Sequence, residues 1–247
     1  MCVRPSNNSP DPPAALFAVA TTHDAMTTLD TTEDLQRLVD SGVVAVMRGA
    51  DADTVLDVAD ALEAGGVTAF EITADNPDAM ELIAEVSASF DESTAIVGAG
   101  TVLDAETARA AITSGAEFVV GPTFDPEVVE TCNRYGVPVA PGVLTPTEAL
   151  SAYEAGADVA KVFPASSVGP GHLSSIAGPL PQIPLMPTGG IDLDNVADYI
   201  EAGAAVVGAG SALMDGAAIS AGEFESITET AREFTRRIAA ARADGDS

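Results

Sequence analysis

Residues 200–210 read "IEAGAAVVGAG" and combine the end of a helix, a glycine turn and an apolar strand. The same order occurs three more times, as "LEAGGVTAFEI" at 62–72, "ITSGAEFVVGP" at 112–122 and "YEAGADVAKVF" at 153–163. Glycine often closes a helix because it adopts the left-handed conformation without steric penalty. Each copy therefore predicts a helix that ends in glycine and is followed at once by a buried strand.

Apolar runs that predict strands recur along the chain at 43–48, 69–73, 95–100, 118–122, 138–143, 159–164, 184–190 and 205–210. Apolar and polar residues do not alternate within these runs, as they would in a strand with one face in water. This absence of alternation is typical of parallel strands that are covered by helices on both faces. Helical stretches such as 51–66 and 104–115 lie between them. Eight such units predict an α/β fold with parallel strands, a single-domain (β/α)8 TIM barrel. An open, doubly wound sheet is the alternative.

The N-terminal residues differ from the rest of the chain. Residues 1–30 are rich in Pro, Ser, Thr and Asn and show no sustained period, so we expect a disordered extension. Met26 is a possible alternative start. Thr31 or Thr32 can cap a first short helix, and we assign residues 31–247 to the barrel domain.

The charge balance is strongly acidic, with 38 Asp and Glu against 10 Lys and Arg and a formal net charge of −28. This excludes nucleic acid and anionic membranes as partners, because both require a positive surface. A solvated acidic surface poor in lysine predicts adaptation to high salt, where screening relieves self-repulsion. An ordinary acidic protein is the alternative.

Other sequence features exclude several classes of protein. Cys2 and Cys132 are too few and too far apart for a disulfide scaffold or a zinc site. No apolar run reaches the roughly 18 residues of a membrane span, and the N-terminus lacks the basic region of a signal peptide. We expect a cytoplasmic protein without a metal or cofactor, acting on a small molecule.

Lys161 is the single lysine of the chain and lies within the apolar run 159–164. A lysine in a strand can snorkel, with its ammonium in water, but that explanation is weak in a chain that has no lysine elsewhere. Burial favours a neutral amine, which can attack a carbonyl carbon and form a Schiff base. We therefore expect Lys161 to be a nucleophile.

Glu71 lies in the predicted strand 69–73 and should meet Lys161 at the C-terminal end of the barrel, where active sites form. It could be no more than the buried ion-pair partner of Lys161. It could also be the general acid and base that Schiff-base chemistry requires. The convergence of the two side chains favours the second interpretation.

Small residues follow the last two predicted strands, in "PTGG" at 187–190 and "GAGS" at 208–211. Their backbone N–H groups can approach a phosphate, although tight turns alone would also explain the glycines. Arg48, at the end of the first strand, can grip a carboxylate; a surface ion pair with Asp51 or Asp53 is the alternative. The substrate-binding candidates are Arg48, Thr73, Thr101, Pro122, Phe163, Thr188, Gly189, Gly190, Gly210 and Ser211.

Seven motifs occur in a fixed order between residues 43 and 213, within a similarity that extends from about residue 43 to 240: "VVAVMRG", "GGVTAFEIT", "IVGAGTVLD", "PGVLTPTEA", "AKVFPAS", "PTGGIDLDN" and "VGAGSAL". Together they resemble the KHG/KDPG aldolase family, the class I aldolases of the Entner–Doudoroff pathway. The resemblance implies a homotrimer in which Lys161 forms the Schiff base and Glu71 is the general acid and base. It also implies that Thr101 and an arginine bind the pyruvyl carboxylate.

The implied substrate is 2-dehydro-3-deoxy-6-phosphogluconate, which the family cleaves to pyruvate and D-glyceraldehyde 3-phosphate. Its phosphate would lie at Gly189, Gly190 and Ser211. The galactonate epimer and 4-hydroxy-2-oxoglutarate are alternative substrates. From the residues alone, a phosphate-binding isomerase or synthase without covalent catalysis and a non-catalytic binding barrel also stay open.

The sequence departs from one branch of the family. That branch has an arginine four residues after the glutamate, where this chain has Asp75. Another branch relies on an arginine at the end of the first strand, which Arg48 matches. Enzymes for the gluconate and the galactonate compounds share this second pattern, so the pattern does not separate the two substrates.

Overall fold

The computed structural model describes residues 32–91 and 93–245, so the extension predicted at 1–30 lies outside the described residues. A helix over residues 32–40 begins the described chain. The strands are β1 (Val43–Met47), β2 (Ala69–Thr73), β3 (Ile96–Gly100), β4 (Phe118–Val120), β5 (Val139–Ala140), β6 (Gly142–Val143), β7 (Ala160–Val162), β8 (Leu185–Pro187) and β9 (Val207–Ala209). The α-helices that follow are α2 (Val55–Ala64), α3 (Ala79–Ser89), α4 (Ala105–Thr113), α5 (Pro126–Tyr135), α6 (Pro146–Glu154), α7 (Pro170–Ala177), α8 (Val196–Glu201), α9 (Gly216–Ala221) and α10 (Phe224–Gly245).

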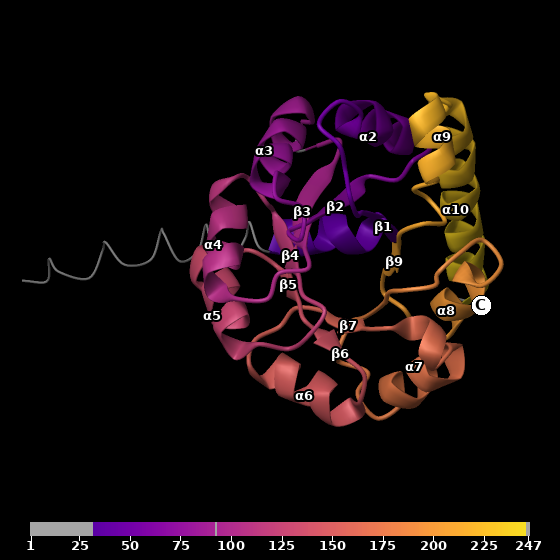
Figure 1. The fold of residues 1–247 in the computed structure, drawn as a ribbon. Coiled ribbons are helices and arrows are strands. Elements are labelled where there is room, and N and C mark those ends of the chain that lie inside the picture. Colours follow the sequence, from indigo (N-terminus) through magenta and orange to yellow (C-terminus); the bar gives the residue numbers. More distant parts are fainter. Residues whose placement is uncertain (1–31, 92, 246–247) are drawn as a thin grey trace, which may run out of the picture.

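The strands form two parallel sheets. One has six strands in the order β5-β4-β3-β2-β1-β9, and the other has three in the order β6-β7-β8. The sheets adjoin at both edges, since Pro141 alone separates β5 from β6 and parallel bridges join Leu185 to Ala204 and Thr188 to Gly208. The helices α2 to α10 lie around the outside of the strands (Figure 1). The predicted α/β fold with parallel strands is therefore confirmed.

Each predicted strand is present, although most are shorter than predicted. The largest difference is in the run 138–143, which divides into β5 and β6 at Pro141. Proline has no N–H to donate to a neighbouring strand. The chain accordingly changes partner there, with β5 paired to β4 and β6 paired to β7.

Both faces of the strands are buried, which explains their continuous apolar sequence. Along β1, Val43 and Met47 belong to a cluster shared with the helices, whereas Val44 belongs to a second cluster. That second cluster joins residues from most of the strands and also contains Leu38 of the helix 32–40. The space enclosed by the strands is therefore a packed core, with polar side chains above it at the strand ends.

The helix-ending glycines follow the predicted pattern with one exception. Gly115, Gly136, Gly156 and Gly203 have positive φ angles between 68° and 103°. Gly65, however, has a φ of −87°, so the prediction of a left-handed residue there is wrong. Glycine is required at this position for a different reason, because a Cβ would lie 2.4 Å from the Ala231 Cβ of α10.

The longest helix, α10, packs against α2 and α8 and is strongly charged along its outer side. Within residues 32–91 and 93–245, no helix is long and apolar enough to cross a membrane.

Candidate active site

Lys161 and Glu71 lie opposite one another inside the sheets. Lys161 is on β7 and Glu71 on β2, and each is almost fully buried, with 5% and 1% of its surface exposed. The Lys161 Nζ lies 4.0 Å from the Glu71 Oε1 and 5.3 Å from the centre of the Phe163 ring. Because buried charges are expensive unless paired, this arrangement explains how the core tolerates both groups.

Gly100, at the end of β3, makes room for the Glu71 carboxylate. A Cβ on Gly100 would lie 1.9 Å from the Glu71 Oε1, so a larger residue would displace the carboxylate. Within the described part of the chain, the other carboxylate oxygen, Oε2, and the Thr73 Oγ1 are buried and have no hydrogen-bond partner. Such atoms are rare in folded proteins, and they often lie where a ligand or water binds.

The environment of Glu71 shifts the pKa of its carboxyl group. Burial raises the pKa of this carboxyl above the ordinary value, and the positive charges of Lys161 and Arg48 oppose that shift without cancelling it. A carboxyl with a raised pKa binds a proton more readily than an exposed carboxyl does. Glu71 therefore stays the candidate for the general acid and base that the sequence predicts.

Arg48 follows β1 and reaches across the ends of the neighbouring strands. One of its terminal nitrogens, NH1, donates to the Asp75 Oδ2, and the other, NH2, donates to the Thr101 Oγ1 at 3.1 Å. The alternative partners considered from the sequence, Asp51 and Asp53, are not bonded to Arg48; the Asp51 carboxylate accepts the backbone N–H of Asp53. Arg48 and Thr101 are therefore brought together, as expected for two groups that bind one carboxylate.

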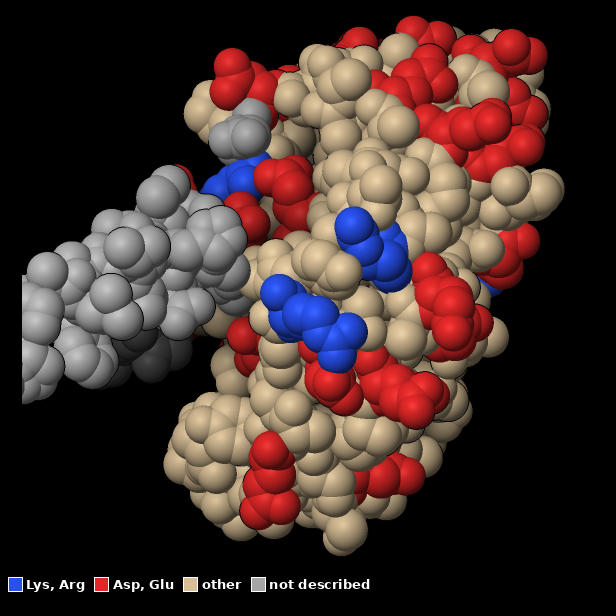
Figure 2. Space-filling view, turned by 90° about the vertical axis from the view of Figure 1, so that its left-hand side faces the viewer, with Lys and Arg blue, Asp and Glu red and all other residues tan. Residues whose placement is uncertain are grey.

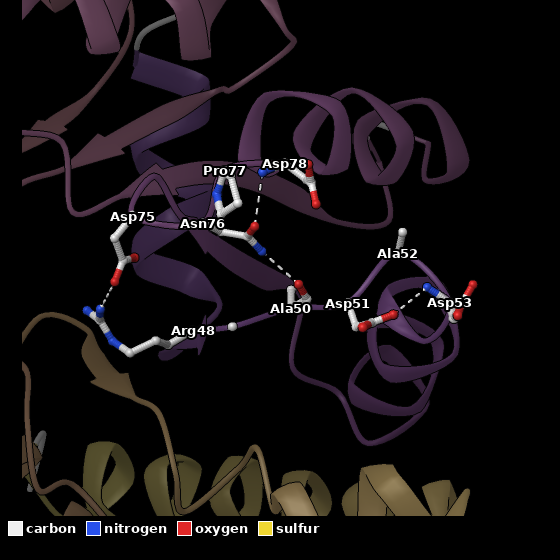
Figure 3. A pocket seen from close by; sticks show the side chains of 10 residues that line it. Arg48, Ala50, Asp51, Ala52, Asp53, Asp75, Asn76, Pro77 and Asp78 are labelled. Atoms are coloured by element: carbon white, nitrogen blue, oxygen red, sulfur yellow. Dashed lines mark hydrogen bonds and ion pairs between the residues drawn. The ribbon is translucent and has the colours of Figure 1, made fainter.

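A cavity of about 520 Å³ opens beside Arg48 (Figure 3). The loops after β1 and β2 form its walls, and the Asn76 side chain ties them together by donating to the Ala50 carbonyl at 2.7 Å. The buried Lys161–Glu71 pair does not line this cavity. Arg48 lies at its edge and contributes its charge both to the cavity and to Glu71.

The loops after β8 and β9 lie side by side, because a bridge joins Thr188 to Gly208. Gly189 and Gly190 have φ angles of 94° and 77°, a conformation that favours glycine. A Cβ on Gly190 would also lie 2.5 Å from the Cβ of Ser166, in the loop after β7. The loop after β8 therefore packs closely against the loop after β7.

The remaining candidates in the adjoining loops differ in exposure. Thr188 is buried, Gly210 is partly buried and Ser211 is exposed. On the other side of Lys161, Pro122 and Phe163 line a common cavity of about 440 Å³.

His172 lies near that second cavity. Its Nε2 is 2.6 Å from the Leu144 carbonyl oxygen, and Leu144 lines the cavity. Among the described residues, no group of three or more His, Cys, Asp and Glu is arranged to hold a metal ion.

Sequence reasoning missed the contact between Arg48 and Asp75. In the sequence, Asp75 stands out only as a departure from a family pattern. Its position in the sequence could have indicated the contact with Arg48. It lies two residues beyond β2, the strand that pairs with β1. Ends of neighbouring parallel strands adjoin, so a charged residue there is within reach of Arg48.

Comparisons with known proteins show which family the chain is similar to. The family model "KDPG and KHG aldolase" matches residues 35–230. A 2-dehydro-3-deoxy-phosphogluconate aldolase of Treponema pallidum is 37% identical over 202 residues, which cover 81% of this chain and 94% of the relative. A 2-dehydro-3-deoxy-6-phosphogalactonate aldolase of Escherichia coli is 36% identical over 172 residues, which cover 69% of this chain and 83% of the relative.

A solved structure extends the likeness to three dimensions. The KDPG aldolase of Legionella pneumophila, crystallised with pyruvate captured as a covalent carbinolamine intermediate, superposes with a TM-score of 0.75 at 29% identity. The match covers 81% of this chain and 96% of that one. Family model, curated relatives and solved structure thus agree over most of both chains, and the chain belongs to the KDPG and KHG aldolase family.

Proposed function

We propose that this protein is a class I aldolase that cleaves 2-dehydro-3-deoxy-6-phosphogluconate to pyruvate and D-glyceraldehyde 3-phosphate. The observation that carries the proposal is the buried pair of Lys161 and Glu71, whose Nζ and Oε1 lie 4.0 Å apart. Lys161 is the single lysine of the chain, and an arginine could not replace it because a guanidinium stays protonated. The name of the Treponema pallidum relative supports the substrate.

The reaction begins at Lys161. The Nζ, after it has given up a proton, adds to the C2 ketone of the substrate, and the resulting carbinolamine loses water to give a protonated imine. The imine then accepts the electron pair of the C3–C4 bond as that bond breaks. The Phe163 ring, whose centre lies 5.3 Å from the Nζ, flanks this amine.

Glu71 moves the protons. Its carboxylate accepts the proton of the C4 hydroxyl as C3–C4 breaks, so that C4 leaves as the aldehyde carbon. The same carboxyl returns a proton to C3 of the enamine, and hydrolysis of the imine releases pyruvate and the free amine. The raised pKa that burial gives Glu71 suits both transfers.

The two charged ends of the substrate bind on opposite sides of Lys161 in this proposal. Arg48 and Thr101 bind the carboxylate, with the buried Thr73 hydroxyl beneath them. Gly189, Gly190 and Ser211 bind the phosphate through backbone N–H groups and a hydroxyl. The remaining candidates, which shape the space between, are Pro122, Phe163, Thr188 and Gly210.

We also infer that the two sheets close into one eight-stranded TIM barrel. One support is that Pro141 alone separates β5 from β6, so that these two strands can be counted as one. The other is that two bridges, Leu185 to Ala204 and Thr188 to Gly208, link β8 and the residue after it to β9 and the segment before it. Closure would place all strand ends around one mouth, which is where barrel active sites form.

Oligomerisation and salt adaptation complete the proposal. A homotrimer is the predicted assembly, and exposed apolar side chains such as Leu103, Tyr135, Leu150 and Tyr153 offer surface for it. Figure 2 supports adaptation to high salt, since acidic side chains are spread over the face in view and the few basic ones lie among them.

Steady-state kinetics with a panel of 2-oxo acids tests the substrate. Pyruvate release would be measured for 2-dehydro-3-deoxy-6-phosphogluconate, its galactonate epimer, the non-phosphorylated gluconate analogue and 4-hydroxy-2-oxoglutarate. We expect the highest kcat/KM for the phosphogluconate compound. A higher value for the galactonate epimer would reassign the substrate, and no pyruvate from any of them would reject the aldolase.

A further inference from the structure

Arg48 holds an unusual position among the basic side chains of the described residues. Lys161 lies in a strand and Arg48 directly follows one, whereas the other described arginines, Arg37, Arg109, Arg134, Arg232, Arg236, Arg237 and Arg242, lie on helices. A substrate anion that enters at the strand ends therefore meets one guanidinium on this side. How that guanidinium is held determines how well it can bind.

Asp75 and Thr101 hold the two terminal nitrogens of Arg48. NH1 donates to Asp75 after β2, and NH2 donates to the Thr101 Oγ1 after β3. Figure 3 shows the Arg48 side chain extended toward Asp75 at the edge of the cavity. The guanidinium thus spans the ends of consecutive neighbouring strands, since β2 pairs with both β1 and β3.

The contact with Asp75 does little for the stability of the fold. The Arg48 and Asp75 side chains are 58% and 45% exposed, and ion pairs with that exposure stabilise proteins weakly. What the contact supplies is orientation. A free arginine side chain samples many rotamers, and ordering it when a ligand binds opposes that binding.

Thr101 gives independent evidence that this corner is built for binding. Its φ angle is +55°, a left-handed conformation that is uncommon and strained for a β-branched residue. Strained residues of this kind cluster at functional sites. In this case the strained residue is the one whose hydroxyl accepts from Arg48.

We propose that Asp75 is a positioning residue, which orients Arg48 toward Thr101 so that the two form a ready-made site for the carboxylate of a 2-oxo acid. The inference rests on the proposed function. Asp75 does not touch the substrate; it acts through Arg48. Of the aspartates that line the cavity, Asp75 is the one that accepts a hydrogen bond from Arg48, whereas Asp51 accepts the backbone N–H of Asp53.

Replacement of Asp75 with alanine tests this role, with Asp53→Ala as the matched control. Asp53 lines the same cavity and carries the same charge, but it contributes its backbone N–H to the neighbouring hydrogen bond. The readout is the pyruvate concentration that gives half-maximal labelling of Lys161 by borohydride, at fixed ionic strength, together with kcat and KM for cleavage. Circular dichroism and melting temperature follow the fold.

We expect Asp75→Ala to raise the half-saturating pyruvate concentration about tenfold, the effect of losing one charge-assisted hydrogen bond or its preorganisation. Asp53→Ala should leave it unchanged or lower it slightly, since less negative charge remains near an anion. Asp75→Glu should restore part of the loss. If Asp75 were merely structural, its replacement with alanine would lower the melting temperature without a selective rise in the half-saturating pyruvate concentration. Glutamate at this position would then not restore pyruvate binding.

Two results would overturn the inference. If Asp75→Ala bound pyruvate as well as or better than wild type, Asp75 would compete for Arg48 rather than position it. If Asp75→Ala and Asp53→Ala shifted binding equally, only net charge would matter. Failure of the wild-type protein itself to be labelled by pyruvate and borohydride would instead overturn the proposed function, and this inference with it.

Discussion

Gly100 and Glu71 fit together so closely that a methyl group on Gly100 would lie 1.9 Å from the Glu71 Oε1. The two residues are in neighbouring strands, and Gly100 faces Thr73 in the register of β2 and β3. The missing side chain at Gly100 leaves the space in which the Glu71 carboxylate can turn toward Lys161. The position of the carboxylate therefore depends on a glycine in the next strand.

Gly100→Ala should displace Glu71 and lower kcat strongly, while destabilising the fold by about 1 to 3 kcal/mol through overpacking. Gly171→Ala is the matched control, since a Cβ there meets nothing within 4 Å. Denaturant unfolding and steady-state kinetics on both variants provide the test. Normal turnover by Gly100→Ala would show that the carboxylate position is not critical.

Glu71→Gln should slow cleavage by about 10² to 10⁴, the range for losing a positioned acid and base. Borohydride trapping of pyruvate should still occur, though slowly, because Lys161 is unchanged. Normal turnover would instead make Glu71 a structural partner of Lys161 only.

The pH dependence of kcat/KM gives a separate test of Glu71. A base must be ionised to accept a proton, so activity should fall as the pH drops through the pKa of Glu71. Since burial raises that pKa, the fall should begin above the ordinary carboxyl range. Glu71→Gln should lose this acid limb, and retention of the limb in the variant would assign it to another group.

Much of the fold could be predicted because its signals are local. Glycine at 115, 136, 156 and 203 ends helices through its own backbone conformation, and continuous apolar runs mark buried parallel strands. The prediction failed where the cause was a contact distant in sequence. Gly65 is glycine because α10 packs against it, and α10 lies more than a hundred residues away.

The candidate site, like the fold, could be predicted in part. Lys161 and Glu71 could be paired from the rule that strand ends converge, because both lie in recognisable strands. The Arg48–Asp75 pair and the left-handed backbone of Thr101 depend on side-chain reach and loop conformation. Neither property has a sequence period. The position of Asp75 after β2 indicates that it is within reach of Arg48, but the contact itself and the backbone angle of Thr101 come only from the structure.

Ser211→Ala tests the phosphate site. If the Ser211 hydroxyl binds phosphate, the change should lower kcat/KM for the phosphorylated substrate. The fall should correspond to a loss of about 1 to 3 kcal/mol in binding free energy, the range for a hydrogen bond to a charged group. The non-phosphorylated analogue should be nearly unaffected. An equal loss for both substrates would show that Ser211 supports the loop without touching phosphate.

Salt should increase activity toward the phosphorylated substrate. The formal charge of −28 repels an anionic substrate over about 30 Å at 0.01 M salt but over only about 3 Å at 1 M. We expect kcat/KM to rise with salt, and to rise less for the non-phosphorylated analogue, which carries less charge. The melting temperature should rise in parallel, and a protein that is equally stable and active at low salt would contradict the adaptation.

Covalent trapping tests the central claim that Lys161 forms a Schiff base with the substrate. The protein would be incubated with pyruvate and borohydride, and its mass measured before and after digestion. Because Lys161 is the single lysine, one reduced pyruvyl adduct should appear on the peptide that contains it. Lys161→Arg, with its fold verified by circular dichroism, should give neither adduct nor cleavage. A wild-type protein that cleaves the substrate without forming the adduct, or a Lys161→Arg variant that cleaves at a rate near wild type, would contradict the account.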